Sequence, residues 1–200
     1  MDTRRAEAFS DGVFAVAITV LVFNLLEITL GKKDPYQDLL NASSSYFAYV
    51  VSFLSIGIMW MNHHTMFGHI TRVDRPVLVL NLFLLLGVVA IPWPTALVAK
   101  HLHDPAGAAA AVLFGLVMIL ISIGFAGLWI YVVTHAAKLG GQVEPETLRR
   151  SVPRFTGGLL AYVAGAVLAA FGLPVAALIL YGLLAIYYLF EHLPAPPDGA

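Results

Sequence analysis

The amino-acid sequence consists mainly of long apolar runs separated by short polar segments. Most of these runs reach about 18 residues, the length that an α-helix needs to cross a hydrocarbon core of roughly 30 Å. In lipid, the backbone hydrogen bonds of a spanning segment must be made internally, and a helix does this within a single run. The pattern therefore predicts an all-α, polytopic membrane protein.

The composition argues against several other classes of protein. Hydrophobic residues make up 60% of the chain and charged residues only 12%, whereas a soluble domain carries roughly a quarter charged residues. A net charge of −1 gives no basic surface for nucleic acid. The chain has no cysteine, which excludes disulfides and thiolate metal sites. We find no nucleophile, base and orienting group at recognisable spacing, so we expect neither an enzyme nor a cofactor.

Polar breaks, glycines and prolines divide the chain into six predicted helices, of which the first has no clear cleavage site and is expected to be retained. Their predicted ranges are 5–30, 39–69, 75–100, 105–137, 155–171 and 174–191. Pro92 and Pro94 predict a kink in the third helix, and Gly172 to Pro174 predict a tight hairpin between the last two. We expect one transmembrane domain over residues 1–193 and a disordered tail over 194–200.

Six spans place both termini on the same side of the membrane, and the basic residues of the loops indicate which side. With the N-terminus inside, the inner loops hold eight basic residues: Arg4, Arg5, Arg72, Arg75, Lys138, Arg149, Arg150 and Arg154. The outer loops hold three: Lys32, Lys33 and Lys100. The positive-inside rule then predicts a multi-pass protein of the cell membrane with both termini in the cytoplasm.

Polar side chains within the predicted spans are the candidates for function, because they are costly in lipid. These residues are Ser10, Asp11, Thr19, Asn24, Glu27, Asn62, His63, His64 and Asn81. His63 and His64 point about 100° apart on a helix, so they cannot hold one metal ion between them, and we expect no metal site. His64 lies one turn after Trp60, and this spacing is typical of a packed, hydrogen-bonded contact between helices.

The beginning of the chain carries a recognisable motif. Arg5-x-x-x-Phe9-Ser10-Asp11, followed by Gly12 to Thr19, resembles the opening signature of the transmembrane protein 175 family of potassium channels. Trp60, His64, Asn81 and the Pro92-Trp93-Pro94 break also resemble that family's pattern, and the six-helix layout agrees over nearly the whole chain. The resemblance implies passive passage of potassium ions. One six-helix unit per chain implies a homotetramer.

The resemblance further implies that the first helix lines the pore. The family's constriction lies five, eight, nine and twelve residues after the signature aspartate, which here gives Val16, Thr19, Val20 and Phe23. These four residues share one face of a helix. Considered without the family resemblance, the same stripe would be more typical of residues that pack inside the protein or face lipid. Family members commonly carry isoleucine or leucine at the narrowest layers, so the valines and Phe23 leave the width of this pore open.

The resemblance assigns a structural network near the inner end of the first helix. Its members are Arg5, Phe9, Ser10, Asp11, Trp60, His64 and Asn81. We expect Arg5 and Asp11 to hold the first helix in place through hydrogen bonds and charge pairing. Glu27, three turns beyond Val16 on nearly the same face, is expected either to ring the outer vestibule or to reach the interface as an isolated carboxylate.

A second hypothesis from another class is a proton- or metal-coupled transporter or enzyme that uses Asp11, Glu27, His63 and His64. A transporter commonly shows paired repeats with interrupted helices. We find no such pair of repeats in the sequence, and we therefore favour the channel.

Overall fold

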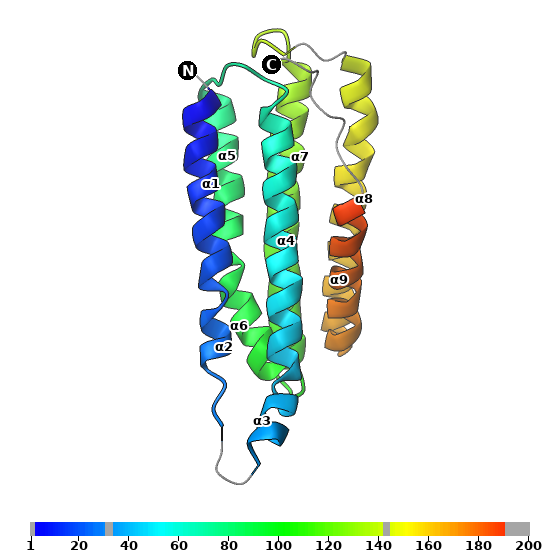
Figure 1. Cartoon of the computed structure of the whole chain (residues 1–200). Coiled ribbons are helices and arrows are strands. Elements are labelled where there is room, and N and C mark those ends of the chain that lie inside the picture. Colours follow the sequence, from blue (N-terminus) through cyan, green and yellow to red (C-terminus); the bar gives the residue numbers. More distant parts are fainter. Residues whose placement is uncertain (1–2, 31–33, 142–144, 191–200) are drawn as a thin grey trace.

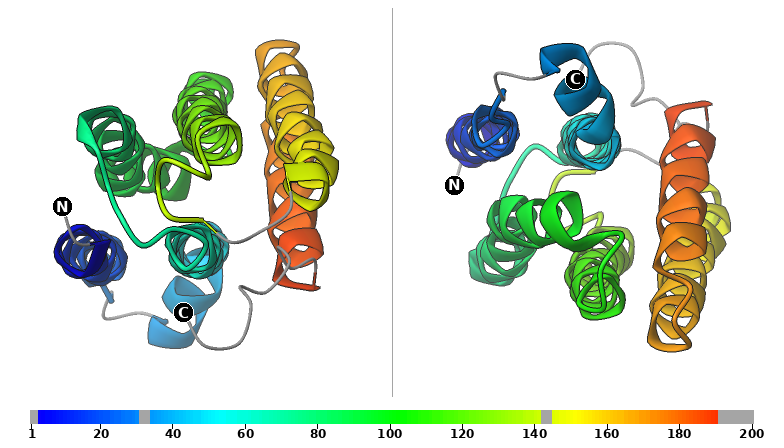
Figure 2. Two further views of the ribbon diagram at one scale, coloured as in Figure 1. Left: turned by 90° about the horizontal axis from the view of Figure 1, so that it is seen from above. Right: turned by 90° about the horizontal axis from the view of Figure 1, so that it is seen from below.

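The structure is a computed structural model that describes residues 3–30, 34–141 and 145–190, and over these residues it is helical. The helices are α1 (Thr3–Val20), α2 (Phe23–Leu26), α3 (Pro35–Asn41), α4 (Ser43–Phe67), α5 (Arg75–Ala90), α6 (Pro92–His101), α7 (Gly107–Thr134), α8 (Pro145–Ala170) and α9 (Pro174–Phe190). Helices α1, α4, α5 and α7 run along one bundle axis (Figure 1), and the α8–α9 hairpin is tilted against them (Figure 2).

The bundle is lopsided, with α1 at one edge and the α8–α9 hairpin at the other (Figures 1 and 2). Helix α1 packs on α4 and α5, whereas α7 packs on α5, α6, α8 and α9. The largest fully buried side chains include Trp129, Tyr181, Phe67, Leu84 and Ile121. The core therefore lies around α7, and α1 covers only one side of it.

Four stretches are long and apolar enough to cross a membrane, namely 3–26, 43–67, 75–101 and 107–134. Helices α8 and α9 add shorter apolar stretches over 157–170 and 174–190. Of the four long stretches, 3–26 is the least buried. Only 22% of its most apolar segment is buried, against 50% for 107–134. The first span therefore leaves most of its surface to lipid, to water or to another chain.

The first helix is shorter than predicted, because its regular part ends at Val20 and not at residue 30. The N–H groups of Val22, Asn24 and Leu25 each bond to the carbonyl three residues earlier, which tightens the turn that leads into α2. The Thr19 hydroxyl donates to carbonyls of the preceding turn, a contact that often bends a helix. The predicted continuous helix is thus wrong beyond Val20, and α2 ends at Leu26.

The predicted starts of two other helices are also wrong. Residues before 43 form the separate helix α3, which Asp34 caps by accepting from the Gln37 N–H and which Pro35 starts at its first position. Helix α8 begins at Pro145, ten residues before the predicted start at 155. Its first turns are too polar to cross a membrane, so hydropathy did not separate them from a loop.

The breaks that were predicted from proline and glycine are confirmed. Helix α5 ends at Ala90 and α6 begins at Pro92. Between α8 and α9, Gly172 takes a φ of +82°, a left-handed conformation that suits glycine. The predicted tail over residues 194–200 lies outside the residues that the structure describes.

Small residues let α7, α8 and α9 approach closely. A side chain added at Gly115 or at Gly165 would run into the ring or the hydroxyl of Tyr181. Tyr181 is only 1% exposed, and its hydroxyl has no hydrogen-bond partner among the described residues. This contact therefore depends on glycine at both positions, and it gains nothing from the hydroxyl.

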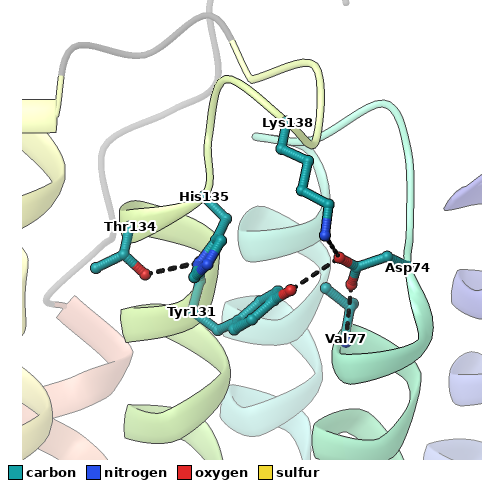
Figure 3. A network of polar contacts seen from close by, with 6 residues as sticks. All are labelled: Asp74, Val77, Tyr131, Thr134, His135 and Lys138. Atoms are coloured by element: carbon teal, nitrogen blue, oxygen red, sulfur yellow. Dashed lines mark hydrogen bonds and ion pairs between the residues drawn. The ribbon is translucent and has the colours of Figure 1, made fainter.

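At the end of the bundle that carries Thr3, a polar network ties the start of α5 to the end of α7 (Figure 3). The Asp74 carboxylate caps α5 by accepting from the Val77 N–H at 3.2 Å, and it also accepts from the Tyr131 hydroxyl at 2.8 Å and the Lys138 ammonium at 2.7 Å. Partial desolvation acts to raise the pKa of Asp74, but these hydrogen bonds outweigh it and lower the pKa to about 2. The Tyr131 ring also stacks on His135 at 4.2 Å.

Candidate functional site

Helix α1 has a buried and an exposed face. The buried residues are Thr3, Ala6, Ser10, Phe14 and Ala17, and Leu21 continues this stripe. The four predicted constriction residues all lie outside this buried stripe. Val16 is 59% exposed, Val20 36% and Phe23 61%, and Thr19 is also exposed. Packing inside the subunit therefore does not account for the stripe, which is left to face a pore, lipid or a second subunit.

Thr19 is the polar member of this exposed stripe. Its hydroxyl donates to the carbonyls of Ala15 and Val16, both at 2.9 Å. A hydroxyl has one proton and two lone pairs, so its oxygen remains able to accept from water or to contact a cation. Thr19 thus presents an oxygen ligand between two apolar side chains, Val16 and Val20.

The buried face of α1 is held by a chain of hydrogen bonds. Asn81 of α5 donates through Nδ2 to the Ser10 hydroxyl at 2.9 Å, and Ser10 donates to the Ala6 carbonyl at 2.8 Å. The Asn81 Oδ1 is then the acceptor for Nε2 of His63, 2.8 Å away on α4, so His63 carries its proton on Nε2. Ser10, Asn81 and His63 are 0%, 2% and 1% exposed. Three helices are joined by one buried polar chain, which fixes the rotation of α1.

Among the described residues this hydrogen bond is made by His63 and not by His64, for which a hydrogen-bonded contact between helices was predicted. His64 is exposed and stacks on Trp60, with ring centroids 6.2 Å apart. His63 packs between Phe14 and Phe67, at 5.4 and 4.4 Å. The sequence did carry a signal for His63, because it follows the buried Met59 by one turn on the same face of α4.

Arg5 and Asp11, which were expected to hold α1 in place, have different surroundings among the described residues. Asp11 accepts from the indole N–H of Trp60 at 2.8 Å. Arg5 is exposed and lies in a different groove. The α1–α4 groove, of about 340 Å³, contains Asp11, Ile18, Ile56, Gly57 and Trp60. The α1–α5 groove, of about 250 Å³, contains Arg5, Phe9, Val73, Leu78 and Leu82. The two charged signature residues thus lie on opposite sides of α1.

Glu27 lies at the other end of the span, after the last residue of α2. It is exposed and borders a polar cavity of about 410 Å³, together with Asn24, Asp38, Asn41, Ser45 and Lys100. The Asn24 amide nitrogen is buried and has no hydrogen-bond partner among the described residues. A cavity of this size and polarity can hold several waters.

The structure does not gather the four residues of the transporter hypothesis into one site. His63 bonds to Asn81 on the buried face of α1, His64 faces outward beside Trp60, and Glu27 borders the cavity at the opposite end of the span. Within the described part of the chain, no group of three or more His, Cys, Asp or Glu side chains could hold a metal ion.

Comparisons with known proteins give consistent matches. Residues 5–92 match a family model described as the endosomal/lysosomal potassium channel TMEM175. A potassium channel of Streptomyces collinus is 42% identical over 204 residues, covering 100% of this chain and 97% of the relative. A potassium channel of Chamaesiphon minutus is 38% identical over 161 residues, covering 78% of this chain and 76% of the relative.

The fold gives a corresponding match. A crystal structure of a lysosomal potassium-selective channel TMEM175 homolog from Chamaesiphon minutus superimposes with a TM-score of 0.81 at 32% identity. It covers 94% of this chain and 96% of the solved chain. The similarity therefore extends over nearly the whole bundle, including the helices that follow residue 92.

Proposed function

The chain belongs to the TMEM175 family of channels, and from this premise we propose that it passes potassium down its electrochemical gradient through a central pore lined by α1. It is a multi-pass membrane channel and not an enzyme, and potassium is the ion that it passes. Passive permeation needs no cofactor. The coupled transporter is not favoured, because the family consists of channels and the four residues it would need lie apart.

The exposed stripe of α1 carries the proposal for the pore. One stripe on one chain cannot enclose a conduit, so several copies must place α1 around a common axis. We propose a homotetramer, since a single six-helix unit per chain can close a ring through one repeated heterologous contact. The low burial of the first span supports this arrangement, because the axis and the neighbouring subunits would cover what its own chain leaves open.

Within this pore, Val16, Val20 and Phe23 form apolar layers with the Thr19 hydroxyls between them. Narrow apolar layers close a pore by dewetting. Potassium loses part of its hydration shell at a lower free-energy cost than sodium, and the Thr19 oxygens, or waters that they orient, replace part of what is lost. Selectivity then depends on the width of the apolar layers together with the hydroxyl ring.

We propose that the channel lies in the cell membrane with both termini in the cytoplasm. The excess of basic residues at that end supports it. The polar cavity beside Glu27 then opens outside, and four copies of Glu27 would ring the outer vestibule and concentrate cations there.

The test is a recording from purified protein in planar bilayers under asymmetric potassium and sodium. Val16→Ala should widen the constriction and raise the current, and Thr19→Ala should lower the potassium to sodium permeability ratio while the tetramer stays intact. Val175→Ala is the matched control, because this side chain is 45% exposed on α9, far from α1. If both α1 variants conduct and select like the parent, α1 does not line the pore. Flux that requires a proton or sodium gradient would instead favour the transporter.

A further inference from the structure

We infer that a cavity inside the subunit binds a small, uncharged molecule with one hydroxyl group and a short apolar body, that is, a short-chain alcohol. The cavity, of about 60 Å³, lies between α4 and α7 on one side and the α8–α9 hairpin on the other (Figure 2). None of the described residues that line it belongs to α1. The inference therefore does not depend on the proposed pore.

The walls of the cavity are mainly apolar. They include Ile58, Met59, Ile121, Phe125 and Ala185. None of the described lining residues carries a charge at neutral pH, so a charged ligand would be buried without a counter-charge, at a high cost. A few polar groups among apolar walls are typical of a site for an uncharged ligand with an apolar body.

Tyr162 of α8 supplies an unused hydrogen-bonding group at the cavity. Its side chain is only 6% exposed, and its ring packs against that of Tyr181 with the centroids 5.6 Å apart. The Tyr162 hydroxyl makes no hydrogen bond to any residue that the structure describes. A buried hydroxyl without a partner is costly. Tyr162 therefore favours a ligand that can accept its proton.

Two serines on α4 and α7 supply acceptors to the same cavity. Ser55 donates to the Val51 carbonyl at 2.7 Å, and Ser122 donates to the Met118 carbonyl at 2.9 Å. Each serine proton is therefore used, and each oxygen can only accept a further hydrogen bond. A ligand hydroxyl can accept from Tyr162 and donate to a serine, whereas an ether or a carbonyl oxygen could only accept.

The size and the depth of the cavity limit the ligand further. An apolar cavity of about 150 Å³ holds benzene, so a cavity of about 60 Å³ fits a molecule of roughly two to three non-hydrogen atoms. Ethanol has this size. Ser55 lies at the midpoint of α4, a helix long enough to cross a membrane. Short-chain alcohols dissolve in both water and lipid, so they can reach a site at this depth.

The test is the unfolding temperature of the purified full-length protein in lipid nanodiscs, measured with and without ethanol. A ligand this small binds in the millimolar range, so we would use about 100 mM ethanol, roughly tenfold above a Kd of about 10 mM. Ethanol also acts on the surrounding lipid. Ala185→Leu fills the cavity and reports this unspecific effect. The change caused by ethanol should be about 3 to 6 °C more positive in the parent than in Ala185→Leu.

Two tyrosine variants decide whether the hydroxyl takes part. Tyr162→Phe should weaken binding about fivefold, the effect of one hydrogen bond, and should lose about half of the specific stabilisation. Tyr181→Phe is the matched control, because it removes a buried hydroxyl that has no partner among the described residues and does not line the cavity. This control should respond to ethanol like the parent.

An equal response to ethanol in the parent, Tyr162→Phe and Ala185→Leu would overturn the site and would mean that the cavity holds water only. If Ala185→Leu does not fold, the two tyrosine variants decide between themselves. A weaker response of Tyr162→Phe than of Tyr181→Phe would support the alcohol site, and equal responses would reject it.

Discussion

Removing the Asn81 side chain should destabilise the protein more than any exposed substitution on α1. Asn81→Ala leaves the N–H of His63 without an acceptor at a site that is 1% exposed. An unpaired buried donor costs about 1 to 3 kcal/mol. The lost bond to Ser10 adds roughly 0.6 kcal/mol, the mean for hydrogen bonds between helices in membranes. With the packing lost around a truncated buried side chain, we expect a total of about 2 to 4 kcal/mol.

The assay is thermal unfolding of the purified protein, followed by tryptophan fluorescence and by the loss of the proposed tetramer on size exclusion. Asn24→Ala is the matched control, because the Asn24 amide nitrogen makes no hydrogen bond to a described residue and its removal should cost little. A triple variant with Ser10→Ala, His63→Phe and Asn81→Leu should be more stable than Asn81→Ala, since it leaves no polar group unpaired. Parent-like stability of Asn81→Ala, or a triple variant as unstable as the single one, would refute the reasoning.

Three further predictions concern other parts of the chain. Glu27→Gln should reduce the conductance most at low ionic strength, because the field of exposed carboxylates is screened over about 8 Å at physiological salt. If the variant and the parent conduct equally at every salt concentration, the ring of Glu27 side chains is rejected. Asp74→Ala should lower the stability by about 1 kcal/mol through loss of the α5 cap. In the parent, the stabilisation by the ionised Asp74 carboxylate should be complete above its ordinary pKa near 4 and should be lost as the pH falls toward 2. The difference in stability between the variant and the parent should therefore vanish in acid. Gly165→Ala should destabilise the α8–α9 contact, whereas Tyr181→Phe should leave the unfolding temperature unchanged or raise it, because the hydroxyl that it removes has no partner.

The sequence predicted the parts of the fold that depend on local chemistry. Apolar runs indicated the long spans, Pro92 indicated the break between α5 and α6, and Gly172 indicated the last hairpin. The tight turn after Val20 was missed, because no glycine or proline marks it. It depends on threonine hydroxyl bonds and on packing around the fully buried Leu21. The early start of α8 was missed because its first turns carry the polarity of a loop.

The candidate site was only partly predictable for the same reason. The family resemblance indicated Ser10 and Asn81, but it pointed to His64 and not to the adjacent His63, which completes their chain of hydrogen bonds. The sequence also did not show which partners Arg5 and Asp11 would take. Residues six apart on a helix point about 120° away from each other. The indole N–H of Trp60 bonds to the Asp11 carboxylate.

Helix α1 has an inverted distribution of polarity, and this inversion favours the pore. A helix on the surface of a soluble protein buries apolar residues and exposes polar ones. In α1 the buried face includes Ser10, which is 0% exposed, whereas the exposed face carries Val16 at 59%, and Phe23 of α2 continues the exposed stripe at 61%. A purely lipid-facing helix would explain the exposed apolar side chains, but it would not need a hydrogen-bonded chain across three helices to fix its rotation. A pore needs the rotation of α1 to be fixed. If α1 turned about its own axis by one residue position, about 100°, other side chains would replace every layer of the constriction. The buried polar chain and the exposed apolar stripe are therefore two requirements of the same function.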